Sequence, residues 1–265
     1  MKIFLYFFIA LLCTFAGAIT GMGGGVVIKP VLDLMGDFDN ASIGALSSIT
    51  VLAMSLTTFA RLCTKKRQTK LSKLLLLGVS SAGGGVLGQY LFERMTTIGI
   101  DMHTVKIVQN SILLCLIAGI FVYMLLRKRI TPLHLNHFVF YILVGFVLGI
   151  LSSFLGIGGG PMNVAVLMLL FGMEIKEATF ASIVTILFAQ IAKVVTIAIG
   201  GGFGGYDLSM LPYMIVAGVV GGLLGSMVAK KLSDKFTAVA FNLMQIAVIA
   251  ICIVNIATNA VALRI

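Results

Sequence analysis

Charged side chains are scarce in this sequence, at 11% of 265 residues, whereas 60% of the residues are hydrophobic and the mean hydropathy is +1.13. A soluble domain usually carries about 25% charged residues, and a much smaller share cannot cover a water-facing surface. The composition therefore excludes an ordinary globular enzyme, a disordered protein and, despite a net charge of +10, a protein that binds nucleic acid. It predicts an integral membrane protein surrounded by a lipid bilayer.

Histidine and cysteine are also rare, with three and four residues. The cysteines are scattered without CxxC spacing, and no histidine lies in the middle of an apolar segment, as a haem ligand would. The sequence has no Ser/His/Asp set, no paired carboxylates and no phosphate-binding P-loop. We therefore expect no catalytic residue, no metal ligand and no cofactor, and we expect a protein that is not an enzyme.

Apolar segments recur along the whole chain, and a membrane-spanning helix needs about 20 mostly apolar residues. Full-length segments lie at 41–62, 71–93, 103–126, 176–199, 209–229 and 237–262. Two further stretches, 3–36 and 138–172, are too long for one span and are interrupted by glycines. Consecutive glycines unwind a helix, so each stretch is expected to form a helix, a break and a shorter helix.

The two glycine breaks resemble each other. An offset of 135 residues (156 minus 21) places Gly21-Met22-Gly23-Gly24-Gly25 on Gly156-Ile157-Gly158-Gly159-Gly160, and Pro161 follows the second run directly. Two later matches, at 48–49 with 182–183 and at 84–88 with 221–225, keep the same order. These matches predict an internal duplication into a first membrane repeat at 1–130 and a second at 131–265.

Lysine and arginine counts indicate the topology, because cytoplasmic loops carry the excess of both. If all eight segments cross once, eleven basic residues face inside and five face outside. If both broken segments are re-entrant, thirteen face inside, at 61–73, 127–129, 176 and 230–235, against Lys2, Arg94 and Arg264 outside. The second topology fits better, and it inverts the two repeats relative to each other, as in many secondary transporters. The length of the helix before each break favours the eight-crossing alternative.

Three lysines lie within the apolar segments, at Lys29, Lys106 and Lys193. Lysines near helix ends can extend to the membrane interface, which suits Lys29 and Lys106. Lys193 lies several residues inside its segment, and a charged group there is a functional candidate because burial in lipid is costly.

The glycine breaks also indicate an anion site. A helix that starts after a break presents unpaired backbone N–H groups, and without a Cβ these can approach an anion closely. The candidate substrate-binding residues are Gly23, Gly24, Gly25, Gly158, Gly159, Gly160, Pro161, Asn163, Ser48, Ser182 and Lys193, with Gln190 as a further hydrogen-bonding side chain. The glycines at 84–88 and 221–225 are better explained by close helix packing.

The duplicated glycine motif, with Pro30 and Pro161, resembles the TauE/SafE family of sulfite exporters and anion permeases, over nearly the whole chain. The resemblance implies transport of sulfur-containing oxyanions or organic anions, such as sulfite, sulfonates or thiosulfate, across a bacterial inner membrane. Asp33 is the only acid near a broken helix, so a coupling proton or sodium ion stays open, as does a homo-oligomer.

The sequence thus predicts an all-α polytopic membrane protein with two homologous halves. Each half has one glycine-broken helix and three transmembrane helices. The predicted function is transport of a small anion. The alternatives are a membrane scaffold or assembly factor that transports nothing, and a membrane-embedded redox protein.

Overall fold

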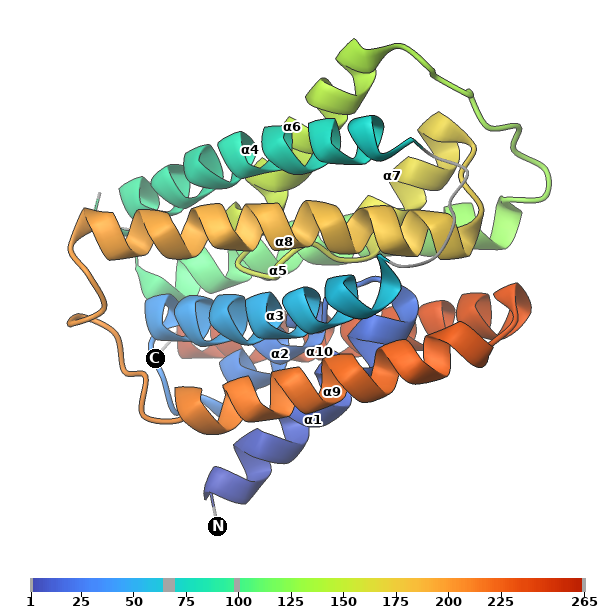
Figure 1. Cartoon of the computed structure of the whole chain (residues 1–265). Helices are drawn as coiled ribbons and strands as arrows, with labels where there is room; N and C mark the ends of the chain where they lie inside the picture. The colour runs from blue at the N-terminus through green and yellow to red at the C-terminus, as the bar shows by residue number, and fades with distance from the viewer. Residues whose placement is uncertain (1, 64–69, 98–100, 264–265) are drawn as a thin grey trace.

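The computed structural model describes residues 2–63, 70–97 and 101–263, and these residues form helices joined by short loops (Figure 1). The helices are α1 (Lys2–Thr20), α2 (Gly25–Met35), α3 (Asn40–Leu62), α4 (Leu71–Thr97), α5 (Met102–Leu126), α6 (Phe138–Phe154), α7 (Pro161–Phe171), α8 (Ile175–Gly200), α9 (Leu211–Lys231) and α10 (Asp234–Ala262). Seven of them, all except α2, α6 and α7, are long and apolar enough to cross a membrane. The chain is therefore a multi-pass α-helical membrane protein.

Polar residues define the helix ends. Asp39, Asp101 and Ser233 accept hydrogen bonds from the first backbone N–H groups of α3, α5 and α10. These caps satisfy N–H groups that have no partner inside the helix. The short helices α2 and α7 both end at a glycine in the left-handed conformation, Gly36 at φ +70° and Gly172 at φ +67°. Left-handed glycine is a common helix stop because it has no Cβ.

Helices α4, α8, α3 and α9 pack side by side in this order, from top to bottom in Figure 1. Helix α6 packs on α4, α1 packs on α9, and α5 packs on α10 behind this row. If each helix of α1–α5 is matched with the helix five places later, α4 corresponds to α9, α6 to α1 and α8 to α3. The packed pairs α4–α6 and α4–α8 then correspond to α9–α1 and α9–α3, which are also packed. The packing is thus arranged as a two-fold repeat predicts, although the duplication itself stays a prediction.

Both glycine-broken segments return to the end of the bundle from which they start. At the start of α1, Lys2 Nζ lies 2.8 Å from Asp37 Oδ1 and Tyr6 donates to Asp37 at 2.6 Å, just beyond the end of α2. Before α6, the N–H groups of Leu133 and Leu135 donate to carbonyl groups near the end of α7, at 2.9 and 2.8 Å. Each broken segment is therefore a hairpin, as the re-entrant topology predicts.

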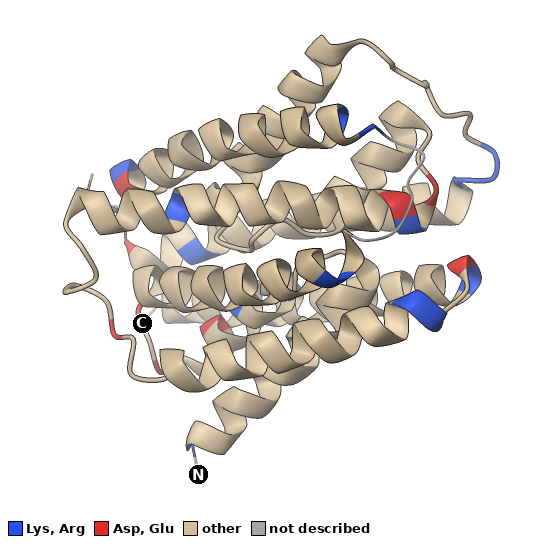
Figure 2. Ribbon diagram, viewed as in Figure 1, with Lys and Arg blue, Asp and Glu red and all other residues tan. Residues whose placement is uncertain are grey.

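The two hairpins enter from opposite ends of the bundle. We name these the Asp37 end, with residues 36–39 and 201–210, and the Arg127 end, with residues 127–137, 172–174 and 232–233. The described lysines and arginines of 61–73, 127–129, 176 and 230–235 belong to the Arg127 end, and Lys2 and Arg94 to the Asp37 end (Figure 2). Residues 65–67 and 264 lie outside the described residues. The distribution still predicts a cytoplasmic Arg127 end.

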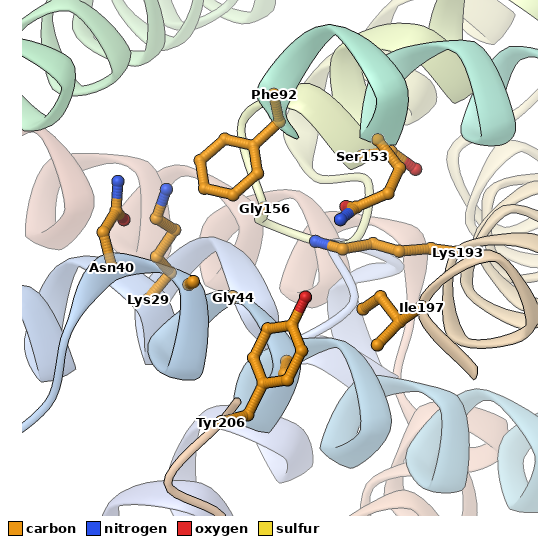
Figure 3. Close-up of a pocket in the computed structure, with 12 residues that line it drawn as sticks. Lys29, Asn40, Gly44, Phe92, Ser153, Gly156, Lys193, Ile197 and Tyr206 are labelled. Carbon is orange, nitrogen blue, oxygen red and sulfur yellow. The ribbon is translucent and has the colours of Figure 1, made fainter. Parts of the chain in front are cut away.

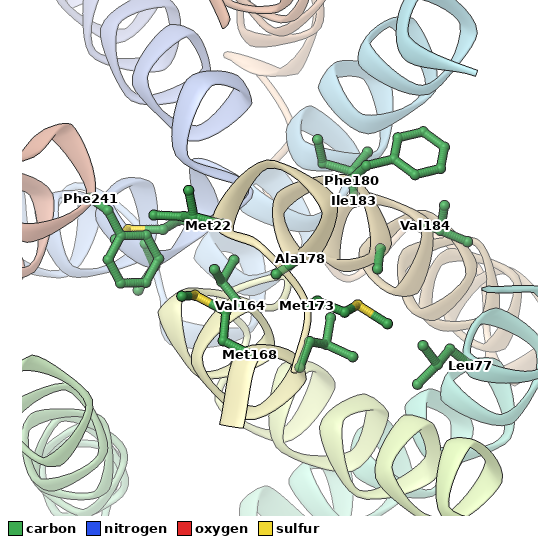
Figure 4. Close-up of a cluster of buried hydrophobic side chains, with 14 of the residues drawn as sticks. Met22, Leu77, Val164, Met168, Met173, Ala178, Phe180, Ile183, Val184 and Phe241 are labelled. Atoms are coloured by element: carbon green, nitrogen blue, oxygen red, sulfur yellow. The ribbon is translucent and has the colours of Figure 1, made fainter. Parts of the chain in front are cut away.

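A large apolar cluster joins the elements near the Arg127 end (Figure 4). Met22 from the first break, Val164 and Met168 from α7, and Ala178 and Ile183 from α8 are buried in it. Methionine side chains are flexible and fill irregular gaps, which suits a junction between non-helical and helical backbone. This cluster holds the two breaks against α8.

The later glycine runs serve packing, as predicted. A Cβ at Gly84 or Gly88 of α4 would overlap carbonyl oxygens of α6, and a Cβ at Gly225 of α9 would overlap the Phe15 carbonyl oxygen of α1. Small residues at such crossings let helix backbones approach closely.

Candidate functional site

The two glycine breaks meet in the interior of the bundle. A Cβ on Gly25 would overlap the carbonyl oxygen of Ile157, and one on Gly23 would lie 3.0 Å from the carbonyl oxygen of Gly158. Ser182 of α8 donates to the Gly21 carbonyl oxygen at 2.7 Å. The glycines are needed here because the two backbones contact each other directly.

The second break carries buried polar groups without a hydrogen-bond partner. Within the described residues, the backbone N–H groups of residues 157–160 have no acceptor, although all four residues are buried. Gly158, Gly159 and Gly160 have φ angles of +71°, +104° and +130°, which favour glycine. Buried polar groups in proteins are normally paired, so this row of donors requires an acceptor that the described chain does not supply.

Two side-chain amides flank the same break. Asn163 of α7 and Gln190 of α8 are fully buried, and neither end of either amide has a hydrogen-bond partner among the described residues. A Cβ at Gly158 would lie 3.4 Å from the Gln190 nitrogen, and one at Gly159 would lie 3.1 Å from the Asn163 nitrogen. The side-chain amides of Asn163 and Gln190 therefore lie next to the unpartnered backbone N–H groups of residues 157–160.

A pocket adjoins this break at Ser153 and Gly156 and reaches Tyr206 of the Asp37 end (Figure 3). Its empty space, open solvent included, is about 260 Å³. Its wall is formed by Lys29, Asn40, Ala41, Gly44, Ala45, Gln89, Phe92, Ser153, Gly156, Lys193, Ile197 and Tyr206. The wall contains two lysines and no carboxylate. We name it the lysine cavity, and its excess positive charge suits an anion.

The two lysines of the cavity differ in their partners. Lys29 Nζ donates to the Gln109 side-chain oxygen at 2.5 Å and to the Leu155 carbonyl oxygen at 2.9 Å. Lys193 is only 3% exposed, and in the described part of the chain its ammonium group has neither a hydrogen bond nor an ion pair. Figure 3 shows its ammonium end directed into the cavity. Glu93 of α4 is near enough for its charge to act on Lys193. An ionisable group buried in a membrane helix is costly, which makes Lys193 a functional candidate.

The structure brings some of the predicted residues together and uses others for packing. Lys193 lines the cavity, and Gly158, Gly159, Gly160 and Asn163 lie at the second break that adjoins it. Pro161 begins α7. Gly23, Gly24 and Gly25 are buried at the first break against other backbone, Ser182 is bonded to Gly21, and Ser48 donates to the Gly44 carbonyl oxygen at 2.6 Å.

Sequence reasoning missed several cavity residues. Asn40, Gln89 and Tyr206 belong to three different elements, and no motif connects them. Lys29 was predicted to extend to the membrane interface, but its side chain is 3% exposed and turns inward. Ser153 lies three residues before Gly156 of the second break, and this position was the one available signal. Over the described residues, no group of histidine, cysteine and acidic side chains could hold a metal ion.

The chain matches the family model described as sulfite exporter TauE/SafE over residues 6–252. A search of the curated proteins and a search of the solved structures find no significant match. The match includes both glycine breaks, both cavity lysines and all ten helices in whole or in part. The chain therefore belongs to the TauE/SafE sulfite exporter family of membrane transporters.

Proposed function

We propose that this protein carries a small sulfur-containing or organic anion, such as sulfite, a sulfonate or thiosulfate, through the lysine cavity. The observation that carries the proposal is Lys193, a buried lysine without an ion pair, in a pocket whose wall also includes Gly156 of the second break. An oxyanion would supply hydrogen-bond acceptors and a negative charge inside the pocket together. The proposed location is a bacterial inner membrane with the Arg127 end in the cytoplasm.

The proposed binding mode assigns separate tasks to the groups at the site. Lys193 and Lys29 provide charge, while the N–H groups of residues 157–160 and the Asn163 amide provide directional hydrogen bonds. The cavity reaches residues of the Asp37 end, so the substrate would enter from that side in this conformation. Rearrangement of the two halves about the breaks would open the site to the Arg127 end, as alternating access requires.

Lys193→Met is the direct test. Loss of one charge-assisted hydrogen bond costs about 1.5–3 kcal/mol, so the Kd for the anion should rise by roughly tenfold to a hundredfold. The measurement is stabilisation of the purified full-length protein against heat by sulfite, thiosulfate, a sulfonate, a carboxylate and phosphate, with Kd values for each. Lys193→Arg should retain part of the affinity because it keeps the charge.

Lys176→Met is the matched control, because Lys176 is exposed at the Arg127 end and pairs with Asp234 at 3.7 Å. It removes the same charge without touching the cavity and should leave the Kd unchanged. If no anion stabilises the wild-type protein, or if Lys193→Met binds as wild type does, the proposal is wrong. The first of these results would favour a scaffold that transports nothing.

A further inference from the structure

A second pocket, with about 170 Å³ of empty space including open solvent, shares Lys29 with the lysine cavity. Its wall is formed by Lys29, Pro30, Asp33, Gln109, Asn110, Leu113, Leu155 and Ile157. Lys29 and the second break therefore border two cavities, one with two lysines and one with a carboxylate. We name the second one the aspartate cavity.

Asp33 lies one helical turn after Lys29 on α2 and is 7% exposed. Its nearest cation is Lys106 of α5, with Nζ 3.7 Å from Asp33 Oδ1. That distance is too long for a hydrogen bond, and Asp33 Oδ1 accepts none from the described residues. Asn110 and Lys106 are the hydrogen-bonding side chains that act on the carboxyl group. Because an ionised carboxylate inside a membrane protein normally has both oxygens satisfied, Asp33 Oδ1 remains incompletely satisfied as an anion.

Gln109 connects the two cavities. Its oxygen accepts from Lys29 at 2.5 Å and from Asn40 at 3.2 Å, and Asn40 lines the lysine cavity. Its nitrogen donates to the Phe154 carbonyl oxygen at 2.7 Å, just before the second break. A change of charge at Asp33 acts electrostatically on Lys29, one helical turn away, and Lys29 is hydrogen-bonded to Gln109 in this buried polar network.

We propose that Asp33 is a proton-binding residue whose protonation is linked to anion binding in the lysine cavity; the inference rests on the proposed function. A charged Asp33 offsets part of the positive charge of Lys29 and Lys106. Protonation removes this offset, so the field at the lysine cavity becomes more positive and the anion binds more tightly. Because binding linkage is reciprocal, the bound anion also strengthens proton binding at Asp33, and the two travel together.

Within the part of the chain that the structure describes, a small set of other titratable groups faces Asp33. Lys29 is on its own helix, Lys106 is on α5 and Cys252 is on α10, while Tyr6 of α1 donates to Asp37. The adjoining residues Asn110 and Asn255 are uncharged, and Asn255 donates to the Pro30 carbonyl oxygen at 2.8 Å. His103 lies three residues before Lys106 and contacts Asn259 through Nδ1 at 2.8 Å. An imidazole can change charge near neutral pH, so His103 is the group that an experiment must separate from Asp33.

The test uses purified full-length protein and thiosulfate, which stays fully ionised over the range studied. In weakly buffered solution, a pH indicator should report proton uptake when thiosulfate binds to the wild-type protein. The thiosulfate Kd should fall about tenfold between about pH 8 and about pH 5, a coupling of the usual allosteric size. Asp33→Asn imitates the protonated state, so it should bind tightly across the range and take up no proton.

Two further variants make the result specific. His103→Gln should keep both the wild-type pH dependence and the proton uptake. The double variant Asp33→Asn with Lys106→Gln removes both charges of the pair, so that no buried charge is left without its partner. It replaces the single variant if that one fails to fold, and it should likewise lose proton uptake.

The outcomes separate this inference from the proposed function. If thiosulfate binds with the same Kd at every pH and without proton uptake, the linkage is wrong and the anion site stands. If Asp33→Asn keeps the wild-type uptake, or if His103→Gln abolishes it, the proton site is not Asp33. If neither thiosulfate nor any of the other anions named above binds at any pH, both proposals fail.

Discussion

The two glycine breaks have nearly the same sequence, but the structure uses them differently. In the first, the N–H groups of Gly21, Met22 and Gly25 have partners within 17–25, and those of Gly23 and Gly24 have none among the described residues. Ser182 also donates to the Gly21 carbonyl oxygen. In the second, the N–H groups of 157–160 have none among the described residues. The first break is a packed support, and the second presents its donors.

The flanking residues explain this difference. Gly23 and Gly24 have φ angles of +77° and +54°, which close a tight turn in which Gly25 donates to Gly23. Gly159 and Gly160 have φ angles of +104° and +130°, and the chain is more extended before Pro161 fixes the first turn of α7. Proline directly after the glycines thus favours an open break, whereas Val26 at the matching place permits a closed one.

Among the substitutions that test how the two breaks differ, Gly25→Ala should lower the stability of the protein most. The new Cβ would overlap the Ile157 carbonyl oxygen, which belongs to backbone and cannot rotate away. Overpacking costs about 1–3 kcal/mol, and more where backbone must move, so the yield of folded protein and the Tm should fall sharply. The measurement is thermal unfolding of the purified protein.

Gly119→Ala is the control for that change. Gly119 lies in α5 with no atom within 4 Å of its Cβ position, and alanine is the better helix former. Its Tm should match or exceed that of the wild type. If Gly25→Ala unfolds at the wild-type temperature, the breaks do not contact each other as described.

Much of the fold could be predicted from the sequence, because apolar length and glycine spacing depend on local residues. The predicted segment 41–62 corresponds to α3 (Asn40–Leu62), and 176–199 corresponds to α8 (Ile175–Gly200). The roles of single side chains were harder to predict. Whether Lys29 extends to the membrane interface or turns inward depends on Gln109, which lies 80 residues away in sequence. The Lys106 pair with Asp33 likewise arises only when α2 and α5 come together.

Asn163→Leu tests the second, open break, and we expect it to have an intermediate effect, on the Kd for the anion. The anion should lose one neutral hydrogen bond, so its Kd should rise about tenfold. Without anion, the Tm should stay the same or rise, because an unsatisfied buried amide costs about 1–3 kcal/mol and the substitution removes it. Calorimetry with the best-binding anion, together with thermal unfolding without anion, gives both values.

Gln245→Leu is the matched control for Asn163→Leu. Gln245 of α10 is also fully buried, and both ends of its amide lack a partner among the residues that the structure describes, but it lines neither cavity. It should stabilise the protein in the same way without changing the Kd. Equal Kd values for the two variants would mean that Asn163 does not contact the anion.

The smallest expected effect concerns the open ends of the two hairpins. The first is closed by side chains, Lys2 and Tyr6 on Asp37, whereas the second is closed by backbone hydrogen bonds from Leu133 and Leu135. The hydrogen bond from Lys2, followed by that from Tyr6, lowers the pKa of Asp37 below its ordinary value of 3.8. A carboxyl group with a lowered pKa in the folded state stabilises that state above its unfolded pKa and loses this contribution as the pH falls.

Only the first hairpin should therefore weaken in acid. Asp37→Asn should lower the Tm slightly at neutral pH, since exposed ion pairs contribute little and salt screens them. The difference between wild type and variant should shrink as the pH falls below about 3.8, where Asp37 becomes protonated in both the folded and the unfolded state. Thermal unfolding of both proteins across this range measures the difference. A difference that is constant with pH would show that the Asp37 carboxylate charge does not hold the hairpin closed.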